Sequence, residues 1–234
     1  MSAPFRLVLL RHGHSEWNLT DRFTGWTDIA LTDIGLQEAA LCGRIIAEAD
    51  FAFDEVHLSA LKRTRQTAEQ LLLAAQHPAI PMHTSWRLNE RHYGELQGLD
   101  KQQIFAQWGK EQSRRWWRGF TDAPPALDHS DLRHPRHDPL YRDIEPQLMP
   151  GSESLQQCQQ RLIPYWQQTL TPRIQAGRRL LVVSHGNTLR ALRMHVEDIS
   201  PKDIEQVEIP SAQALVYYFD QHMRLLDSQW LAAE

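Results

Sequence analysis

The sequence has little cysteine and no long apolar run. Its 234 residues include two cysteines, Cys42 and Cys158, which are too few for a disulfide framework and lack the spacing of a zinc ribbon. Each falls on the apolar face of an expected helix, so we interpret both as core residues. No segment approaches the roughly 20 apolar residues of a membrane-spanning helix, and residues 1–10 lack the pattern of a signal peptide. We therefore expect a cytoplasmic protein without a membrane partner.

The sequence also lacks an excess of basic charge. Its formal net charge is -4 with histidine counted as neutral, and 41% of the residues are hydrophobic and 23% charged. These values are typical of a globular protein, and the acidic balance argues against general nucleic-acid binding. A local cluster of cations in one pocket is still compatible with this balance. At this length the chain can form one large α/β domain or two small ones.

Apolar runs alternate with helical patterns along the chain. Residues 5–10 and 179–184 are short and rich in Leu and β-branched side chains, which predicts two buried strands. The further predicted elements are a helix over residues 31–49 with Thr32 as N-cap, a short strand and a helix within residues 54–75 with Ser59 as cap, a helix over about 187–197, and a hairpin of residues 214–220 and 223–231. This alternation predicts an α/β fold of three layers, α/β/α, with a mostly parallel central sheet covered on both faces.

Residues 90–150 differ from the rest of the chain. They are rich in Trp, Arg, His, Pro and Gly and show weak periodicity, but no flexible Gly/Ser linker flanks them. We therefore predict a single domain over residues 1–234, in which residues 90–150 form an insertion over the active site.

Two histidines stand in matched contexts. In RLVLLRHGHSEWN (residues 6–18) and RLLVVSHGNTLRALR (residues 179–193), His12 and His185 each follow an apolar strand and precede a glycine. Ligands bind beyond the carboxyl ends of strands in such sheets, glycine lets backbone amides approach a ligand, and a helix start favours anions. A single histidine in this place more often caps a strand or fills the core. The matched pair favours a functional site.

Histidine is also a common metal ligand. His12 and His14 would share a face if the first strand continued to Ser15, and His134 and His137 are close in the sequence. However, no His-Glu-x-x-His helix occurs, and a metal ion beside Arg11 would be repelled. We expect no metal.

Arginines accompany the two histidines. Arg11 adjoins His12, Arg63 opens a helix, and Arg118 lies in SRRWWRGF beside Arg114 and Arg115. Guanidinium groups bind phosphate oxygens and stabilise a transferring phosphoryl group, although an isolated arginine is usually a surface charge. SRRWWRGF is alternatively an amphipathic surface or a nucleic-acid patch.

An arginine beside a histidine suits nucleophilic catalysis. Arg11 disfavours the protonated form of His12, and a neutral imidazole can attack phosphorus to give a phosphohistidine. A proton donor is also needed, and RLNERHYGELQG places Glu90 in a loop with several polar residues.

Several motifs together resemble one known family. The segments LLRHGHSEWN, RFTGWTDIALTDIG, LSALKRTRQTA, LNERHYGELQGL, WWRGF, HDPLY and SHGNTLRAL resemble the cofactor-dependent phosphoglycerate mutases of the histidine phosphatase superfamily, from about residue 5 to residue 228. The resemblance implies a phosphoglycerate mutase-like fold with the active site at the C-terminal ends of the strands. It makes His12 the phosphorylated nucleophile and Glu90 the proton donor and acceptor, with His185 stabilising the phosphoryl group beside Arg11 and Arg63. The substrate-binding residues that it implies are Asn18, Thr24, Gly25, Arg91, His92, Tyr93, Lys101, Trp117, Arg118, Gly186 and Asn187.

The resemblance also implies a reaction. The family interconverts 3-phosphoglycerate and 2-phosphoglycerate in glycolysis and gluconeogenesis, is primed by 2,3-bisphosphoglycerate and needs no metal. Its partner is the small phosphoglycerate substrate, and its members often form homodimers or homotetramers.

Three departures from the family pattern leave alternatives open. His14 stands where the family usually has Glu or Gln, Trp117 replaces the first of two arginines before GF, and the chain stops at Glu234 without a polar C-terminal tail. Arg114 or Arg115 is a candidate to replace the missing arginine. The loss of one clamp and of a lid would favour water as phosphoryl acceptor, so the main alternative is a phosphatase that acts through phosphorylated His12. A non-catalytic protein that binds phosphate ligands is a further alternative.

Overall fold

A six-stranded sheet forms the centre of the protein. The computed structural model describes residues 5–231. The strands of this part are β1 (Phe5–Arg11), β2 (Glu55–Leu58), β3 (Met82–Thr84), β4 (Leu180–Ser184), β5 (Ala214–Phe219) and β6 (Leu225–Trp230). Their order is β3-β2-β4-β1-β5-β6, in which the first four are parallel and β5 and β6 are antiparallel. The predicted α/β fold with a mostly parallel sheet is confirmed.

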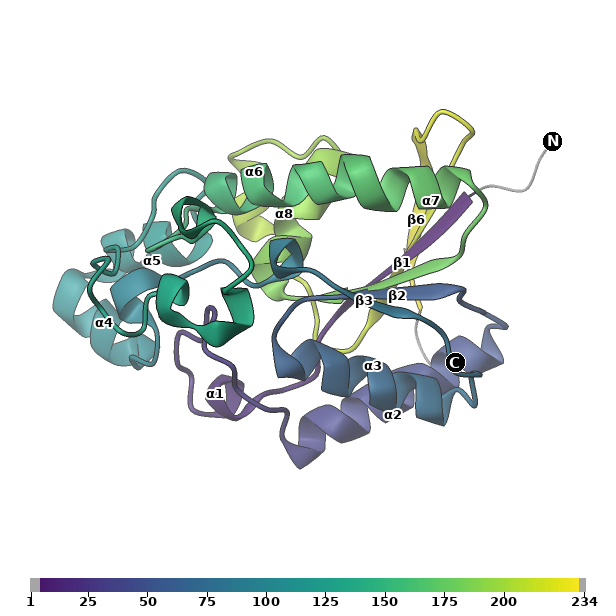
Figure 1. The fold of residues 1–234 in the computed structure, drawn as a ribbon, viewed down its shortest axis with the longest axis horizontal. Helices are drawn as coiled ribbons and strands as arrows, with labels where there is room; N and C mark the ends of the chain where they lie inside the picture. Colours follow the sequence, from purple (N-terminus) through teal and green to yellow (C-terminus); the bar gives the residue numbers. More distant parts are fainter. Residues whose placement is uncertain (1–4, 232–234) are drawn as a thin grey trace.

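Helices cover both faces of this sheet (Figure 1). The helices are α1 (Glu16–Leu19), α2 (Asp33–Glu48), α3 (Lys62–Ala74), α4 (Lys101–Trp108), α5 (Lys110–Arg118), α6 (Leu155–Tyr165), α7 (Thr171–Gln175) and α8 (Gly186–Val196). Short 3₁₀ turns span Trp86–Leu88, Gly94–Leu96, Pro135–His137, Pro139–Tyr141, Pro146–Leu148 and Asp203–Gln206, and a π turn, Trp166–Leu170, joins α6 to α7. No helix within residues 5–231 has the length and apolar character needed to cross a membrane.

The apolar side chains of β1 point alternately to the two faces of the sheet and so contribute to two hydrophobic clusters, one on each face. Leu7 and Leu9 pack with residues of α6 and α8, whereas Val8 and Leu10 pack with residues of α2 and α3. Successive side chains of a strand point to opposite faces, so a strand that is apolar throughout must be covered on both. The two cysteines are buried and unpaired, as the sequence predicts.

The helix caps agree with the sequence in one case and differ in the other. Thr32 caps α2, because its hydroxyl accepts a hydrogen bond from the backbone N–H of Gly35 at 3.1 Å. The prediction that Ser59 caps α3 is wrong, since that helix begins at Lys62 with Leu61 at the cap position. The Ser59 hydroxyl turns instead toward His185, at 2.8 Å.

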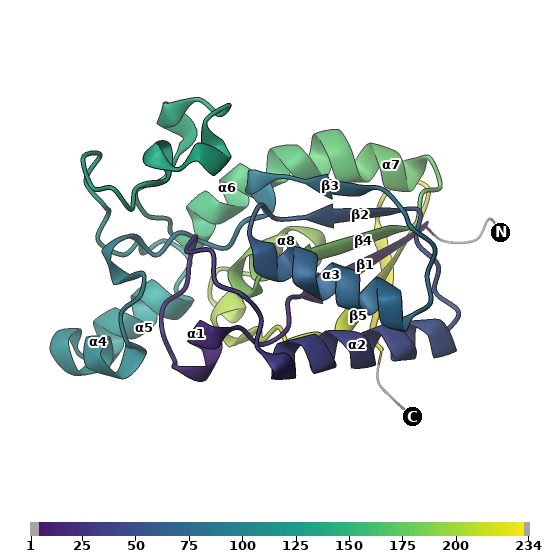
Figure 2. The ribbon, with the colours of Figure 1, turned by 60° about the horizontal axis from the view of Figure 1, so that its bottom comes forward.

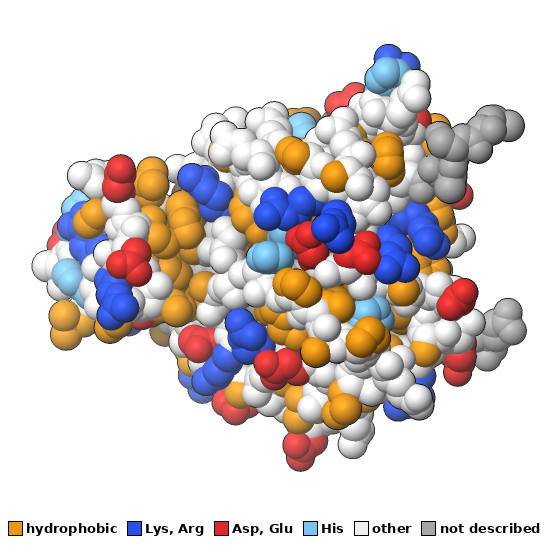
Figure 3. Space-filling view, turned by 45° about the vertical axis from the view of Figure 1, so that its right-hand side comes forward, with side chains coloured by type: hydrophobic (Ala, Val, Ile, Leu, Met, Phe, Trp, Pro, Cys, Tyr) orange, Lys and Arg blue, Asp and Glu red, His pale blue; other side chains and the backbone are white. Residues whose placement is uncertain are grey.

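The segment between β3 and β4 carries the elements that surround the ends of the strands. Figures 1 and 2 show α4, α5 and the 3₁₀ turns of residues 135–148 at the end of the molecule toward which the parallel strands run. This is the edge at which ligands bind in parallel sheets. On the face seen in Figure 3, Lys and Arg side chains lie close to Asp and Glu side chains.

Candidate active site

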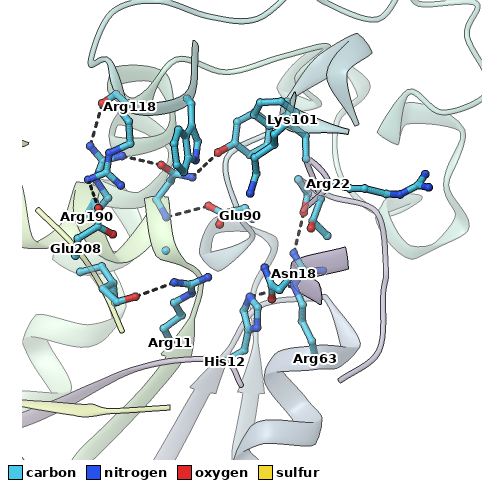
Figure 4. Close-up of a pocket in the computed structure, with 18 residues that line it drawn as sticks. Arg11, His12, Asn18, Arg22, Arg63, Glu90, Lys101, Arg118, Arg190 and Glu208 are labelled. Carbon is cyan, nitrogen blue, oxygen red and sulfur yellow. Dashed lines mark hydrogen bonds and ion pairs between the residues drawn. The ribbon is translucent and has the colours of Figure 1, made fainter. Parts of the chain in front are cut away.

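A cavity of about 130 Å³ opens where β1 and β4 end. It is lined by Arg11, His12, Asn18, Arg22, Phe23, Thr24, Gly25, Arg63, Glu90, Tyr93, Lys101, Trp117, Arg118, Gly186, Asn187, Arg190, Glu208 and Ile209. Figure 4 shows that these residues come from segments far apart in the chain and that several cationic side chains converge on one space. A cavity with this concentration of guanidinium groups suits a phosphate group.

His12 lies at the base of this cavity in a defined tautomer. Its Nδ1 lies 2.7 Å from the carbonyl oxygen of Gly13, and a carbonyl can only accept, so Nδ1 carries the proton. The other nitrogen, Nε2, accepts a hydrogen bond from Nε of Arg63 at 3.3 Å. Burial lowers the pKa of His12 well below its usual value, and Arg63 and then Arg11 lower it further. His12 is therefore neutral, and its Nε2 carries the lone pair that can attack phosphorus once a bound phosphoryl group takes over the hydrogen bond from Arg63.

The cause of this neutrality differs from the sequence-based interpretation. From the sequence, the neutral state of His12 was attributed to Arg11. In the structure, burial lowers the pKa of His12 most, and Arg63 lowers it more than Arg11 does. The side chain of His12 is 4% exposed and that of Arg63 is 1% exposed, so both groups have lost most of their hydration.

His185 lies directly behind His12. Because β1 and β4 are neighbours in the sheet, with Arg11 opposite Ser184, the two imidazole rings meet with centroids 5.0 Å apart. Nε2 of His185 pairs with the Ser59 hydroxyl at 2.8 Å, while its Nδ1 is buried without a partner within the described residues. Burial and the neighbouring Arg63 lower its pKa. The unpaired Nδ1 is suited to contact a phosphoryl oxygen.

Arg63 is fixed by the loop that contains Gly25. Its two terminal nitrogens donate to the carbonyl oxygens of Thr27 at 2.9 Å and Gly25 at 2.8 Å. Gly25 has a φ of +53°, and a Cβ there would overlap the side-chain amide of Gln97. This position therefore requires glycine for both conformation and space, and the constraint aligns Nε of Arg63 with His12.

Glu90 is held above the histidines by two backbone amides. Its Oε1 accepts hydrogen bonds from Arg91 N–H at 2.8 Å and Asn187 N–H at 3.1 Å. No described residue hydrogen-bonds Oε2. One carboxylate oxygen thus anchors the side chain, and the other is available to exchange a proton with a ligand in the cavity.

A buried ion pair that the sequence analysis missed supports the Glu90 loop. Arg161 of α6 binds the Glu153 carboxylate through two nitrogens, at 2.7 and 2.9 Å, and also donates to the carbonyl oxygens of Asn89 and Glu90 at 3.2 Å. Glu153 in turn accepts from the backbone N–H of His92 at 2.9 Å. Glu153 precedes the N-cap of α6 and Arg161 lies within that helix, and this spacing in the sequence gives no indication of their partners.

The far end of the cavity is formed by α5 and the segment before β5. Arg118 donates through Nε and Nη2 to the Glu205 carbonyl oxygen, at 2.9 and 2.7 Å, and Nη2 also lies 2.8 Å from the Val207 carbonyl and 3.0 Å from the Glu208 carboxylate. Arg190 binds Asn187 Oδ1 and the carbonyl oxygens of Arg118 and Ile204. Neither Arg190 nor Glu208 was predicted as a site residue. Arg190 lies within the motif SHGNTLRAL but its pattern does not show that its side chain faces the cavity, and Glu208 lies outside the recognised motifs.

Most of the predicted site residues line the cavity, and three do not. His185 is fully buried behind His12, while Arg91 and His92 point elsewhere. Arg91 lies 4.7 Å from the centre of the Tyr93 ring and donates to the carbonyl oxygen of Trp117 at 2.8 Å. His92 accepts from Gly94 N–H at 3.0 Å, and burial lowers its pKa to about 3. Arg91 and His92 therefore position the loop and do not reach the cavity.

Neither arginine proposed to replace the missing clamp reaches the cavity. Arg114 lies 3.8 Å from Glu205, and Arg115 pairs with Glu111 at 2.7 Å, and both are more than half exposed. Neither candidate takes the place of the missing arginine at Trp117, because their position on α5 turns them outward. Arg22 and Arg190 line the cavity instead.

His14 leaves the site because β1 ends at Arg11. Its Nδ1 pairs with the Glu38 carboxylate at 2.6 Å, on the side of α2. Within residues 5–231 no group of three or more His, Cys, Asp or Glu side chains is arranged to hold a metal ion.

Comparison with known proteins gives the same family over most of the chain. Residues 7–229 match the model of the histidine phosphatase superfamily, branch 1. A solved structure titled mycobacterial hydrolase 1 is 21% identical, with a TM-score of 0.74, and the match covers 98% of this chain and 99% of that chain. A mycobacterial glucosyl-3-phosphoglycerate phosphatase complexed with VO3 is 23% identical, with a TM-score of 0.69 and coverage of 91% and 92%.

A third similar structure is the alpha-ribazole phosphatase from Shigella flexneri. It is 21% identical, with a TM-score of 0.64, and the match covers 92% of this chain and 91% of that chain. At these identities the structures show a shared fold. The match of the family model to residues 7–229 shows that the chain belongs to the histidine phosphatase superfamily, branch 1, a family of phosphotransferases and phosphatases.

Proposed function

We propose that this protein is a phosphatase that hydrolyses a small phosphate monoester through a phosphohistidine on His12. The observation that carries the proposal is the neutral His12 imidazole, whose Nε2 faces Arg63 at 3.3 Å in a cavity lined by Arg11 and Arg63. The proposed nucleophile and the cations that stabilise the phosphoryl charge thus occupy one space.

The first step forms a bond between Nε2 of His12 and phosphorus, and the ester P–O bond breaks. Protonated Glu90 gives its proton to the leaving alkoxide, so the alcohol departs neutral. Nδ1 of His12 keeps its proton, which the Gly13 carbonyl accepts at 2.7 Å. The charge on the equatorial phosphoryl oxygens is met by Arg11 and Arg63, which line the cavity.

The second step reverses the proton transfer. The Glu90 carboxylate removes a proton from water, the oxygen attacks phosphorus, and the N–P bond breaks to release inorganic phosphate and neutral His12. Glu90 is thereby protonated again and His12 is restored. One carboxyl group is sufficient for both steps, because its protonation state alternates between them.

The far end of the cavity supports water as the acceptor. A mutase must hold a second anionic group of its substrate, and Arg118 is one of the residues to which the family resemblance assigns substrate binding. Here Arg118 is bound to two backbone carbonyls and to the carboxylate of Glu208. Glu208 lines the cavity and repels a second phosphate or carboxylate. These residues fit 2,3-bisphosphoglycerate poorly.

A second candidate is the phosphoglycerate mutase reaction implied by the sequence motifs. The observation in its favour is that Asn18, Tyr93, Lys101, Arg118 and Asn187 all line the same cavity as His12. They are the positions that the resemblance assigns to the substrate. In this reading 2,3-bisphosphoglycerate would prime the enzyme and its partner would be phosphoglycerate.

One assay separates the two candidates. The protein is incubated with 3-phosphoglycerate and a priming amount of 2,3-bisphosphoglycerate, and 2-phosphoglycerate and free phosphate are followed together. Phosphate release that exceeds isomerisation supports the phosphatase, whereas isomerisation that outruns phosphate release supports the mutase. If neither product forms and no acid-labile phosphoprotein is detected with any phosphate ester, the catalytic proposal fails.

A further inference from the structure

A larger groove on the surface of α5 adjoins the phosphate cavity. Three residues of the cavity, Trp117, Arg118 and Glu208, also line an adjoining groove of about 400 Å³. The groove is completed by Phe105, Lys110, Arg114, Glu205 and Gln206. A leaving group that extends from a phosphate bound at His12 toward this groove would pass the Trp117 side chain, which lines both.

Trp117 gives this groove a flat apolar surface. Its side chain is 36% exposed although it lies between the cavity and the groove. The ring of Phe105 meets it edge to face, with centroids 6.1 Å apart, and Arg118 lies 5.8 Å from its centre. A partly exposed indole backed by a second aromatic ring is suited to pack against a ring of a ligand.

The groove is lined by the cations Lys110, Arg114 and Arg118 and by the carboxylates of Glu205 and Glu208. Arg118 lies 3.0 Å from the Glu208 carboxylate, and Arg114 lies 3.8 Å from that of Glu205. Two guanidinium groups of the groove thus have carboxylate partners. The Glu208 side chain is 76% exposed and is free to meet a ligand. A carboxylate or second phosphate placed beyond Trp117 would compete with the Glu208 carboxylate for Arg118. The negative charge of Glu208 would also repel it.

We propose that the groove between α5 and residues 205–208 binds the leaving group of the substrate, and that it selects phosphate esters of ring-bearing alcohols without a second anionic group. This inference rests on the proposed phosphatase function and adds a substrate class to it. Trp117 packs against the ring, and Glu208 rejects negative charge. Trp117 stands where the family resemblance implies an arginine. In this proposal the substitution removes a contact to an anionic group and adds a contact to the ring of the leaving group.

Three synthetic esters test the inference, because all three have an alcohol as leaving group. Benzyl phosphate carries a ring, glycerol 1-phosphate has none, and 4-carboxybenzyl phosphate adds one carboxylate to the ring. We expect kcat/KM to be highest for benzyl phosphate. Trp117→Ala should lower the ratio of kcat/KM for benzyl phosphate over glycerol 1-phosphate by about tenfold, which corresponds to roughly 1.4 kcal/mol.

Trp108→Ala is the matched control for the tryptophan. Trp108 is 49% exposed on α4 but lines neither the cavity nor the groove, so its removal should leave that ratio unchanged. Glu208→Gln keeps the shape of the side chain and removes its charge. It should raise kcat/KM for 4-carboxybenzyl phosphate over benzyl phosphate by about five- to tenfold.

The outcomes separate this inference from the function on which it rests. If all three esters release phosphate but Trp117→Ala leaves the benzyl to glycerol ratio unchanged, the leaving group does not lie on Trp117 and the inference is wrong. An unchanged discrimination against the carboxylate in Glu208→Gln also overturns it. If no ester releases phosphate or forms an acid-labile phosphohistidine, the proposed function itself fails.

Discussion

The imidazole rings of His12 and His185 lie edge to face, with centroids 5.0 Å apart and an interplanar angle of 63°. Each ring follows a parallel strand, and the two strands are hydrogen-bonded neighbours. Burial and the charges of Arg63 and Arg11 keep both rings neutral. The proposed chemistry depends on this neutrality, because only a neutral His12 has a lone pair with which to attack phosphorus.

Replacing His12 with alanine should abolish formation of the phosphoenzyme. No other nucleophilic side chain lies at the base of the described cavity beside Arg63. The measurement is the acid-labile phosphate bound to the protein after incubation with a labelled ester. His14→Ala is the control, since His14 pairs with Glu38 outside the cavity and its loss should leave the labelling intact. Covalent phosphate on the His12→Ala protein would exclude His12 as the nucleophile.

Glu90→Gln should slow hydrolysis by about 10²- to 10⁴-fold while orthovanadate still binds. Glutamine keeps the oxygen that accepts from Arg91 and Asn187 but cannot exchange a proton. Hydrolysis is followed as phosphate release, and binding as inhibition by vanadate. Glu95→Gln, at an exposed position of the same loop, is the control. Equal losses of binding and turnover would contradict a role in proton transfer.

Arg161→Met should lower the free energy of unfolding by about 3–5 kcal/mol. The change leaves the buried Glu153 carboxylate without its partner, and it removes the donors that hold the Asn89 and Glu90 carbonyls. Denaturant unfolding measures the loss. Arg133→Gln is the control, because its ion pair with Asp131 is at the surface and should contribute little. Similar unfolding midpoints for Arg161→Met and the wild type would show that the ion pair does not support the loop.

Stability should decrease as the pH falls from 6.5 toward 4. Burial lowers the pKa of His57 to about 4 and that of His92 to about 3, whereas a histidine in the unfolded chain titrates near 6.5. The unfolded chain therefore binds protons that the folded protein does not. The free energy of unfolding is not reduced by these histidines well above pH 6.5. At pH 5 each of the two should lower it by about 2 kcal/mol.

The uptake of protons on unfolding at pH 5.5 tests this relationship directly. Two or more protons should be taken up there and almost none at pH 8, with unfolding midpoints shifting in parallel. A midpoint that is the same at pH 7.5 and pH 5 would mean that these histidines are charged in the folded protein.

The sequence by itself determined strands β1, β2, β4, β5 and β6, helices α2, α3 and α8, and the two histidines, whereas β3, α1 and α4 to α7 were not predicted. Residues 5–10 and 179–184 are apolar on both alternating sets of positions, and such strands are stable only between two helical layers. The helix after residue 186 could also be predicted, and the glycine after each histidine could be recognised as part of a site. Both depend only on residues that are close together in the sequence. His12 and His185 could therefore be paired before the strands were known to be adjacent.

Only the tertiary structure decided which other side chains surround the histidines. Arg190 and Glu208 line the cavity, Arg161 supports the Glu90 loop, and Ser59 binds His185 and does not cap α3. Arg114 and Arg115 turn outward although they adjoin the motif that contains Arg118. These outcomes depend on helix rotation and on contacts between residues far apart in the chain, such as Ser59 and His185, which are 126 positions apart. Local sequence patterns do not encode such distances, because packing of the whole chain sets them.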